Sequence, residues 1–286
     1  MATTFYNQAT LSYNGISTTS NTVTGEIIDT LTVTKNVLTD TYNSDSTLTY
    51  VVNLINTGPT ALTSLTLSDD LGAYDYSDTT TLTPLTYLPG TIQYYVNGVL
   101  QTTPTVTDQS PLTVTGVNIP AGGNAALIYQ ASVNEFASPE AAGNITNTAT
   151  VTGDGLVSAV TASRTVTPSG EPILSINKAV SPTSVSENGE LTYTFTIENI
   201  GNTDAEATDN VSVTDVLSPV LDSLVVTLNG APLTLGTDYT YDTDTGTLVT
   251  TPGRITVPAA TYTQNPTTGA WCVTPGSTVL TVTGTV

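Results

Sequence analysis

Hydrophobic and polar residues alternate along most of this chain. Segments 31–35 (Leu-Thr-Val-Thr-Lys), 65–69 and 112–115 carry an apolar side chain at every second position, and the same period returns at 211–215 and 279–283. A period of two places successive side chains on opposite faces of a β-strand, whereas no long segment shows the 3.6-residue period of a helix. The pattern therefore predicts an all-β protein of the sandwich type.

Two Asn-Gly pairs mark predicted connections between strands. Asn97–Gly98 and Asn229–Gly230 each follow a segment with strand-like alternation. Asn and Gly tolerate the positive φ angles that a two-residue hairpin turn requires. We therefore expect a tight hairpin at each of these pairs.

The strand pattern occurs twice. This internal repeat predicts two homologous domains that follow one another in the chain. The matching segments are 31–35 with 174–178, 48–58 with 191–201, 65–69 with 211–215 and 119–133 with 273–286.

The two copies of the repeat do not contain the same predicted strands. After residue 133 the first copy continues into two further predicted strands, 147–152 and 163–167. Their counterparts stand at the opposite end of the sequence, because 7–12 matches 147–152 and 20–24 matches 163–167. We therefore expect the second domain to lack strands that the N-terminal segment resembles.

The predicted organisation has three parts. They are an N-terminal donor-strand segment, 1–26, and two tandem Ig-like β-sandwich domains, 27–169 and 170–286, of which the second is incomplete without a donated strand.

A sandwich without its last strands exposes apolar side chains and unpaired backbone groups, which form a template for an incoming strand. We expect the donor strands of another copy to fill this site, with Asn7, Ala9, Leu11 and Val23 facing inward. Such a head-to-tail contact does not close on itself and builds a fibre. Folding back onto the second domain of the same chain is disfavoured, because few residues separate the donor strands from the first domain.

The only two lysines, Lys35 and Lys178, occupy the same position of the repeat. Strand alternation places both on the inward face, together with Asp69 or Asp215 and with Asn147. Burial lowers the pKa of a lysine and raises that of an aspartic acid, so the amine becomes a neutral nucleophile. Such an amine can attack an asparagine amide and expel ammonia, which leaves a Lys-Asn isopeptide bond.

These motifs resemble known surface-protein domains. The Lys-ending first strand, Leu-Thr-Tyr followed by Asn-x-Gly at 48–58 and the Asp-ending strand at 211–215 resemble the conserved-repeat, Ig-like domains of bacterial surface proteins. The pattern is also similar to the isopeptide-bonded domains of Gram-positive pilins. The resemblance covers residues 29–286.

The resemblance implies Lys35, Asp69 and Asn147 as an intramolecular cross-linking triad, with Asp69 and Asp215 as the acids that promote bond formation. In the second domain no asparagine follows Lys178 and Asp215 at the matching position, and Asn7 of a neighbouring subunit would supply it.

Simple salt bridges, Lys35 with Asp69 and Lys178 with Asp215, are the alternative to covalent bonds. Asp70, Glu198 or Asn144 could replace the chosen acid or amide partners.

Charge and composition narrow the function further. The chain has 24 acidic and 4 basic residues, no histidine and a net charge of −20, which disfavours binding to nucleic acid or to anionic membranes. Without histidine and with a single cysteine, Cys272, we expect no enzyme beyond a single-turnover isopeptide reaction, no metal site and no cofactor. Cys272 is expected to be a buried, inert thiol. Neither a signal peptide nor a membrane span is recognised.

The sequence therefore predicts a structural subunit of an extracellular filament on a bacterial cell or spore surface. Its partner would be a further copy of itself, giving a homopolymer. The alternative is a monomeric adhesin, or stalk and binding repeats of a surface protein.

Overall fold

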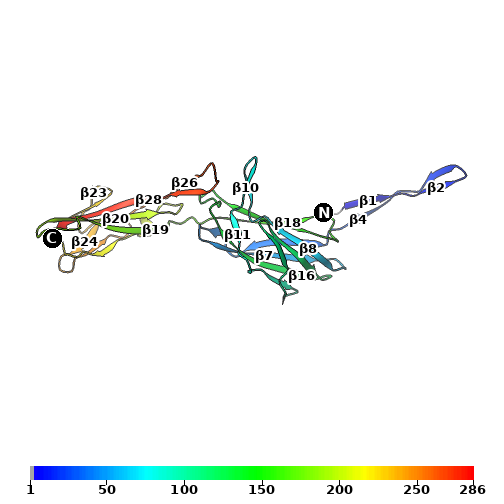
Figure 1. Cartoon of the computed structure of the whole chain (residues 1–286), viewed down its shortest axis with the longest axis horizontal. Helices are drawn as coiled ribbons and strands as arrows, with labels where there is room; N and C mark the ends of the chain where they lie inside the picture. The colour runs from blue at the N-terminus through cyan, green and yellow to red at the C-terminus, as the bar shows by residue number, and fades with distance from the viewer. Residues whose placement is uncertain (1–2) are drawn as a thin grey trace. The chain divides into compact units, whose positions relative to one another are not determined.

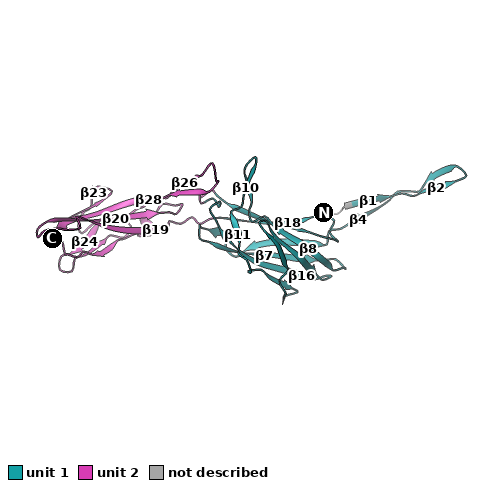
Figure 2. Cartoon of the chain, in the orientation of Figure 1, with its two compact units in different colours: residues 1–138, 143–167 teal, residues 139–142, 168–286 magenta. Residues whose placement is uncertain are grey.

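A computed structural model describes residues 3–286 and is almost entirely β, which confirms the predicted fold class (Figure 1). Among these residues the only helical element is one 3-10 turn, η1 (Ala207–Asp209). The chain divides into two compact units (Figure 2). Unit 1 comprises residues 3–138 and 143–167, and unit 2 comprises residues 139–142 and 168–286.

Unit 1 is a sandwich of two large sheets whose inner side chains form one core. Every second side chain of a strand points into this core, as in the central strand β7, where every second residue is buried. In the first sheet the order is β13 (Val99–Gln101), β12 (Gln93–Val96), β16 (Asn124–Val133), β7 (Thr47–Asn56) and β5 (Leu31–Val37), with β11 (Leu85–Tyr87) also paired to β16. In the second sheet the order is β14 (Thr105–Gln109), β15 (Leu112–Ile119), β8 (Leu62–Asp69), β17 (Ile145–Thr152), β18 (Val160–Pro168) and β6 (Thr41–Tyr42). A separate hairpin joins β9 (Tyr74–Ser77) and β10 (Thr80–Leu82).

Unit 2 has its own core between a five-stranded and a three-stranded sheet. The larger sheet has the order β19 (Leu174–Ser181), β20 (Glu190–Asn199), β28 (Gly276–Thr285), β22 (Asp222–Leu228) and β23 (Ala231–Pro232). The smaller sheet has the order β21 (Thr214–Val216), β25 (Thr247–Thr250) and β24 (Tyr239–Asp242), and β26 (Thr261–Gln264) pairs with β27 (Trp271–Thr274) as a hairpin.

Strand pairing relates the two units. Asp69 of β8 lies opposite Leu112 of β15, and Asp215 of β21 lies opposite Leu248 of β25. In unit 1 the other edge of β8 pairs with β17, whereas in the described part of unit 2 no strand pairs with the other edge of β21. The smaller sheet of unit 2 therefore stops where the sheet of unit 1 continues into β17 and β18.

Two local expectations for unit 2 need correction. The strand predicted at 211–215 is shorter and later, at Thr214–Val216, because the Val213 N–H donates to the side-chain hydroxyl of Thr250 in place of a backbone carbonyl and the ladder with β25 ends there. Cys272 is exposed, since it lies on the two-stranded hairpin of β26 and β27 and outside the core.

The described N-terminal residues form one long antiparallel hairpin (Figure 1). Strand β1 (Thr3–Asn7) pairs with β4 (Val23–Ile27), and β2 (Thr10–Tyr13) pairs with β3 (Ile16–Thr19). The turn is Asn14–Gly15, with φ angles of 46° and 80°. Both turns predicted above are confirmed, because Asn97–Gly98 joins β12 to β13 and Asn229–Gly230 joins β22 to β23, all four residues having positive φ.

Candidate functional site: two lysine–aspartate pairs

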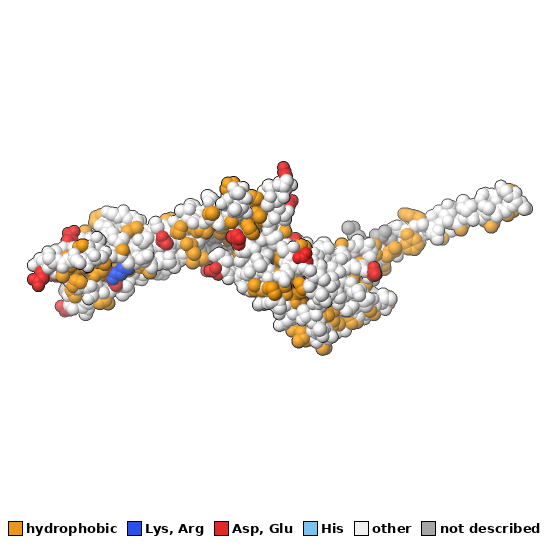
Figure 3. All heavy atoms as spheres, in the orientation of Figure 1, with side chains coloured by type: hydrophobic (Ala, Val, Ile, Leu, Met, Phe, Trp, Pro, Cys, Tyr) orange, Lys and Arg blue, Asp and Glu red, His pale blue; other side chains and the backbone are white. Residues whose placement is uncertain are grey.

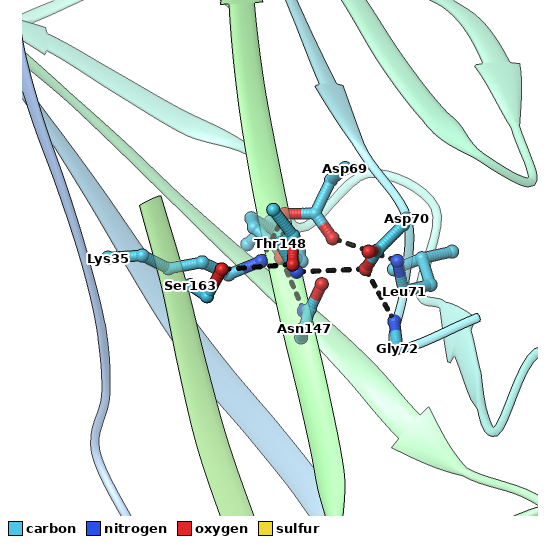
Figure 4. Close-up of polar contacts among 9 residues, drawn as sticks. Lys35, Asp69, Asp70, Leu71, Gly72, Asn147, Thr148 and Ser163 are labelled. Atoms are coloured by element: carbon cyan, nitrogen blue, oxygen red, sulfur yellow. Dashed lines mark hydrogen bonds and ion pairs between the residues drawn. The ribbon is translucent and has the colours of Figure 1, made fainter. Parts of the chain in front are cut away.

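In unit 1 a buried ion pair links the two sheets. The Nζ atom of Lys35, on β5, lies 2.5 Å from Oδ2 of Asp69, on β8, and both side chains are fully buried. Asn147 projects into the same space from β17, the neighbour of β8 (Figure 4). The structure thus brings together the three residues that the sequence singles out for an intramolecular cross-link.

A tyrosine joins this cluster. The Tyr129 hydroxyl donates a hydrogen bond to Asp69 Oδ2 over 2.6 Å and accepts one from Asn147 Nδ2 over 3.0 Å. The Asn147 side-chain oxygen is buried and has no hydrogen-bond partner among the described residues. Sequence reasoning missed Tyr129, although the alternation of Leu127, Tyr129 and Ala131 along β16 marks it as inward-facing.

Burial dominates the electrostatics of the cluster. Desolvation lowers the pKa of Lys35 below its ordinary value of 10.5, although the charge of Asp69 acts in the opposite direction. The pKa of Tyr129 is raised well above 10.0, first by burial and then by the negative charge of Asp69. The Lys35 Nζ atom also lies 4.9 Å from the ring centroid of Tyr50, which stacks on Tyr129. Such surroundings favour an uncharged amine and a protonated phenol.

The alternative partners of the cluster lie elsewhere. Asp70 accepts hydrogen bonds from the backbone N–H groups of Thr148 and Gly72, so its carboxylate fastens β17 beside β8. Asn144 is exposed and precedes β17, and Glu198 is exposed on β20 of unit 2. Of the candidate acids and amides, Asp69 and Asn147 are the ones gathered around Lys35.

In unit 2 the equivalent pair is open. Lys178 Nζ, on β19, lies 2.5 Å from Asp215 Oδ2, but their side chains are 39% and 19% exposed. The lysine was predicted to point into the core, and it lies instead at an uncovered edge, 4.4 Å from the ring centroid of Tyr193. On the neighbouring strand, Val282 lies opposite Tyr193, whereas at the equivalent position of unit 1 Tyr129 lies opposite Tyr50.

The face beside Lys178 is apolar and uncovered. All eight residues of β19 are exposed, whereas in β5 the inward-facing residues are buried. Leu174 and Ile176 share the face of Lys178 and are 39% and 57% exposed. In the described residues no asparagine hydrogen-bonds to this lysine–aspartate pair.

The predicted donor residues are all exposed on the N-terminal hairpin. Asn7 lies opposite Val23, and Leu11 lies opposite Thr18. These donor residues belong to unit 1, whereas Lys178 belongs to unit 2.

The hairpin nevertheless matches the strand that completes unit 1. The inward residues of β17 are Ile145, Asn147, Ala149 and Val151, all buried, and the residues at the same spacing in the hairpin are Phe5, Asn7, Ala9 and Leu11. Sequence reasoning missed Phe5 and the turn at Asn14–Gly15, although that Asn-Gly pair is the same signal that located two other hairpins.

The described residues contain no group of three or more His, Cys, Asp or Glu side chains suited to holding a metal ion. Within residues 3–286 we find no helix with the length and apolar character that a membrane crossing requires.

No family model and no curated protein matches this chain. Similar solved structures include the major pilin subunit BcpA of Bacillus cereus, with 13% identity over 96% of this chain and 73% of that one and a TM-score of 0.36. The major pilin SpaD of Corynebacterium diphtheriae has 14% identity over 86% of this chain and a TM-score of 0.36, and the match spans 59% of SpaD. A collagen-binding domain of a Staphylococcus aureus adhesin has 14% identity over 47% of this chain and 96% of that one, with a TM-score of 0.32. Similarity at this level carries no conclusion about function.

Proposed function

We propose that this protein is the structural subunit of a homopolymeric extracellular filament. Each copy donates its N-terminal hairpin, residues 3–27, to unit 2 of the next copy. The observation that carries this proposal is that one chain has both an open sheet edge, at β21, and a hairpin whose residues resemble the inward residues of β17. The acidic composition and the resemblance of the sequence motifs to bacterial surface proteins favour a bacterial cell or spore surface.

The acceptor site is an edge that requires a partner. An unpaired strand edge presents free backbone N–H and C=O groups, and in unit 1 the equivalent edge of β8 is covered by β17. A donated strand on β21 would satisfy these groups and cover Leu174 and Ile176. Full burial of an exposed aliphatic side chain contributes about 1.5–3 kcal/mol.

The donor is a two-sided hairpin with one apolar face. Alternation along its two strands places Phe5, Leu11, Tyr13, Ile16 and Val23 on one face, and each of these side chains is about half exposed or more. Apolar side chains are visible on this hairpin in orange (Figure 3). A two-stranded ribbon is marginally stable in water by itself, so an apolar face of this size favours docking onto a sheet.

The hairpin and the link to unit 2 leave unit 1 at opposite ends of its strands. Strand β4 ends at Ile27 and β5 begins at Leu31, so the hairpin is tied to the start of β5. Strand β18 ends at Pro168, and the Thr167 amide donates to the carbonyl of Asp40, beyond the far end of β5. The seven residues of β5 separate the two points by about 23 Å. This polarity supports head-to-tail assembly.

Covalent bonds would lock the subunits. In unit 1 the neutral Lys35 amine attacks Cγ of Asn147, the C–N bond of the side-chain amide breaks, and nitrogen leaves as ammonia. The product is an amide between Lys35 and Asn147. Donation of the hairpin in the register of β17 would present Asn7 to Lys178 and Asp215, and the same reaction there would join neighbouring subunits.

Electron microscopy of the purified chain tests the assembly. We expect the full chain to form fibres and a chain lacking residues 2–26 to remain soluble and unpolymerised. A monomeric full chain would support the adhesin or stalk alternative. Fibre growth by the shortened chain would overturn the donor-strand proposal.

A further inference from the structure

We propose that the Tyr129 hydroxyl passes a proton between Asp69 and the leaving nitrogen of Asn147 during formation of the isopeptide bond in unit 1. This inference rests on the proposed Lys35–Asn147 bond and assigns a role to a residue that the sequence motifs do not include.

The hydrogen bonds form one continuous path. Lys35 Nζ contacts Asp69 Oδ2 at 2.5 Å, the same oxygen accepts the Tyr129 hydroxyl at 2.6 Å, and the hydroxyl oxygen accepts Asn147 Nδ2 at 3.0 Å. The other Asp69 oxygen, Oδ1, accepts the backbone N–H of Leu71, so the carboxylate is held from both sides. Asp69 makes no hydrogen bond to Asn147 itself, and the tyrosine bridges the two side chains.

The proton balance fits this path. The attacking lysine nitrogen begins as a neutral amine and ends as an amide N–H, so it loses one proton. The departing Nδ2 begins as an amide NH₂ and gains one proton to leave as ammonia. Asp69 accepts the proton from the lysine nitrogen, while Tyr129 gives its own proton to Nδ2 and recovers one from Asp69. Asp69 and Tyr129 therefore return to their starting protonation states.

The buried environment suits the phenol for this task. Burial and the charge of Asp69 raise the pKa of Tyr129, so the hydroxyl stays protonated and able to donate. The neighbouring Tyr50 hydroxyl interacts with Asn147 but makes no hydrogen bond to Asp69, so it does not bridge the two side chains.

Unit 2 provides an internal contrast. At the position facing Tyr193 it has Val282, which has no hydroxyl to link Asp215 to an incoming asparagine. Both units have the lysine–aspartate pair, but the tyrosine that bridges to asparagine in unit 1 is replaced by Val282 in unit 2. We therefore expect the bond within unit 1 to form faster than the bond at the subunit junction.

Time-resolved intact-mass analysis tests the relay. All chains carry Asn7→Ala, which removes the junction bond, and are made by cell-free synthesis, quenched in acid at intervals and scored for loss of one ammonia. We expect Tyr129→Phe to slow the loss about 100-fold, as removal of a general acid–base group does. Tyr42→Phe is the matched control, because its buried hydroxyl bonds the Ser138 carbonyl away from the cluster, and it should react at the parent rate.

A fluorinated tyrosine incorporated at position 129 separates proton transfer from packing. It keeps the ring and the hydroxyl but makes the hydroxyl more acidic, so we expect the reaction to be faster than with tyrosine. An unchanged rate for this analogue, or parent-rate reaction by Tyr129→Phe, would overturn the relay while the cross-link stands. Absence of any ammonia loss from the parent chain would instead overturn the cross-link itself.

Discussion

Lys35 and Lys178 show how one side chain takes different roles in equivalent strands. Both lie 2.5 Å from an aspartate, but Lys35 is sealed by β17 whereas Lys178 remains 39% exposed. An exposed ion pair contributes at most about 1 kcal/mol, so Lys178 and Asp215 do little for unit 2 by themselves. Removing water from the buried pair of Lys35 and Asp69 costs free energy. The presence of this pair beside an asparagine therefore favours a chemical role over a stabilising one.

Removal of the amide tests that role at a single residue. We expect Asn147→Ala to abolish the ammonia loss of unit 1 and to lower its melting temperature by about 10 °C or more, because a cross-link that closes a loop of about 100 residues contributes about 4.7 kcal/mol. Intact mass and calorimetry measure the two effects. Asn144→Ala, an exposed asparagine on the same segment, is the control and should behave as the parent chain. Equal effects of both substitutions would contradict the assignment.

Part of this cluster could be predicted from the sequence. Alternation places Lys35, Asp69 and Asn147 inward, because each shares the parity of the apolar residues in its strand. The contact of Tyr129 with Asp69 could not be predicted, since it depends on how the two sheets pack and on the register between their strands. The openness of the Lys178 site likewise depends on which strands pair around β21.

At the scale of elements, the N-terminal hairpin and β17 are related by sequence, but their surroundings differ. Ala149 and Val151 are buried in unit 1, whereas Ala9 and Leu11 are exposed at the matching positions. The period of two located β17, but the strand predicted at 7–12 is divided between β1, which ends at Asn7, and β2, which begins at Thr10. The pattern could not say whether the inward faces would be covered, because coverage depends on a partner strand elsewhere in the sequence or in another copy.

Opposite faces of one strand provide a matched test. We expect Leu11→Glu to prevent filament formation, because it would place an unpaired charge in the apolar interface. Ser12→Glu adds the same charge on the other face of β2 and should leave assembly intact. Sedimentation and electron microscopy measure the difference. Loss of assembly in both variants, or in neither, would show that the apolar face of the hairpin does not dock.

At the scale of the whole molecule, charge opposes non-specific association. The chain carries a net charge of −20, and acidic groups are scattered over the face drawn in Figure 3. Repulsion between such surfaces keeps an assembly soluble and disfavours contacts between its sides. In the proposed assembly, growth would depend on the apolar contact between the hairpin and unit 2, and this contact would give the polymer its direction.

Mixing two half-functional chains tests this contact most directly. A chain lacking residues 2–26 keeps only the acceptor, and a full chain with Ile176→Glu, on the uncovered face of β19, keeps only the donor. The substitution Asn177→Glu on the opposite face controls for added charge and should still polymerise. We predict that each half-functional chain alone is monomeric and that an equimolar mixture forms a dimer that grows no further, as measured by light scattering after chromatography. A mixture that remains monomeric, or fibres from either chain alone, would contradict donation of the hairpin to unit 2.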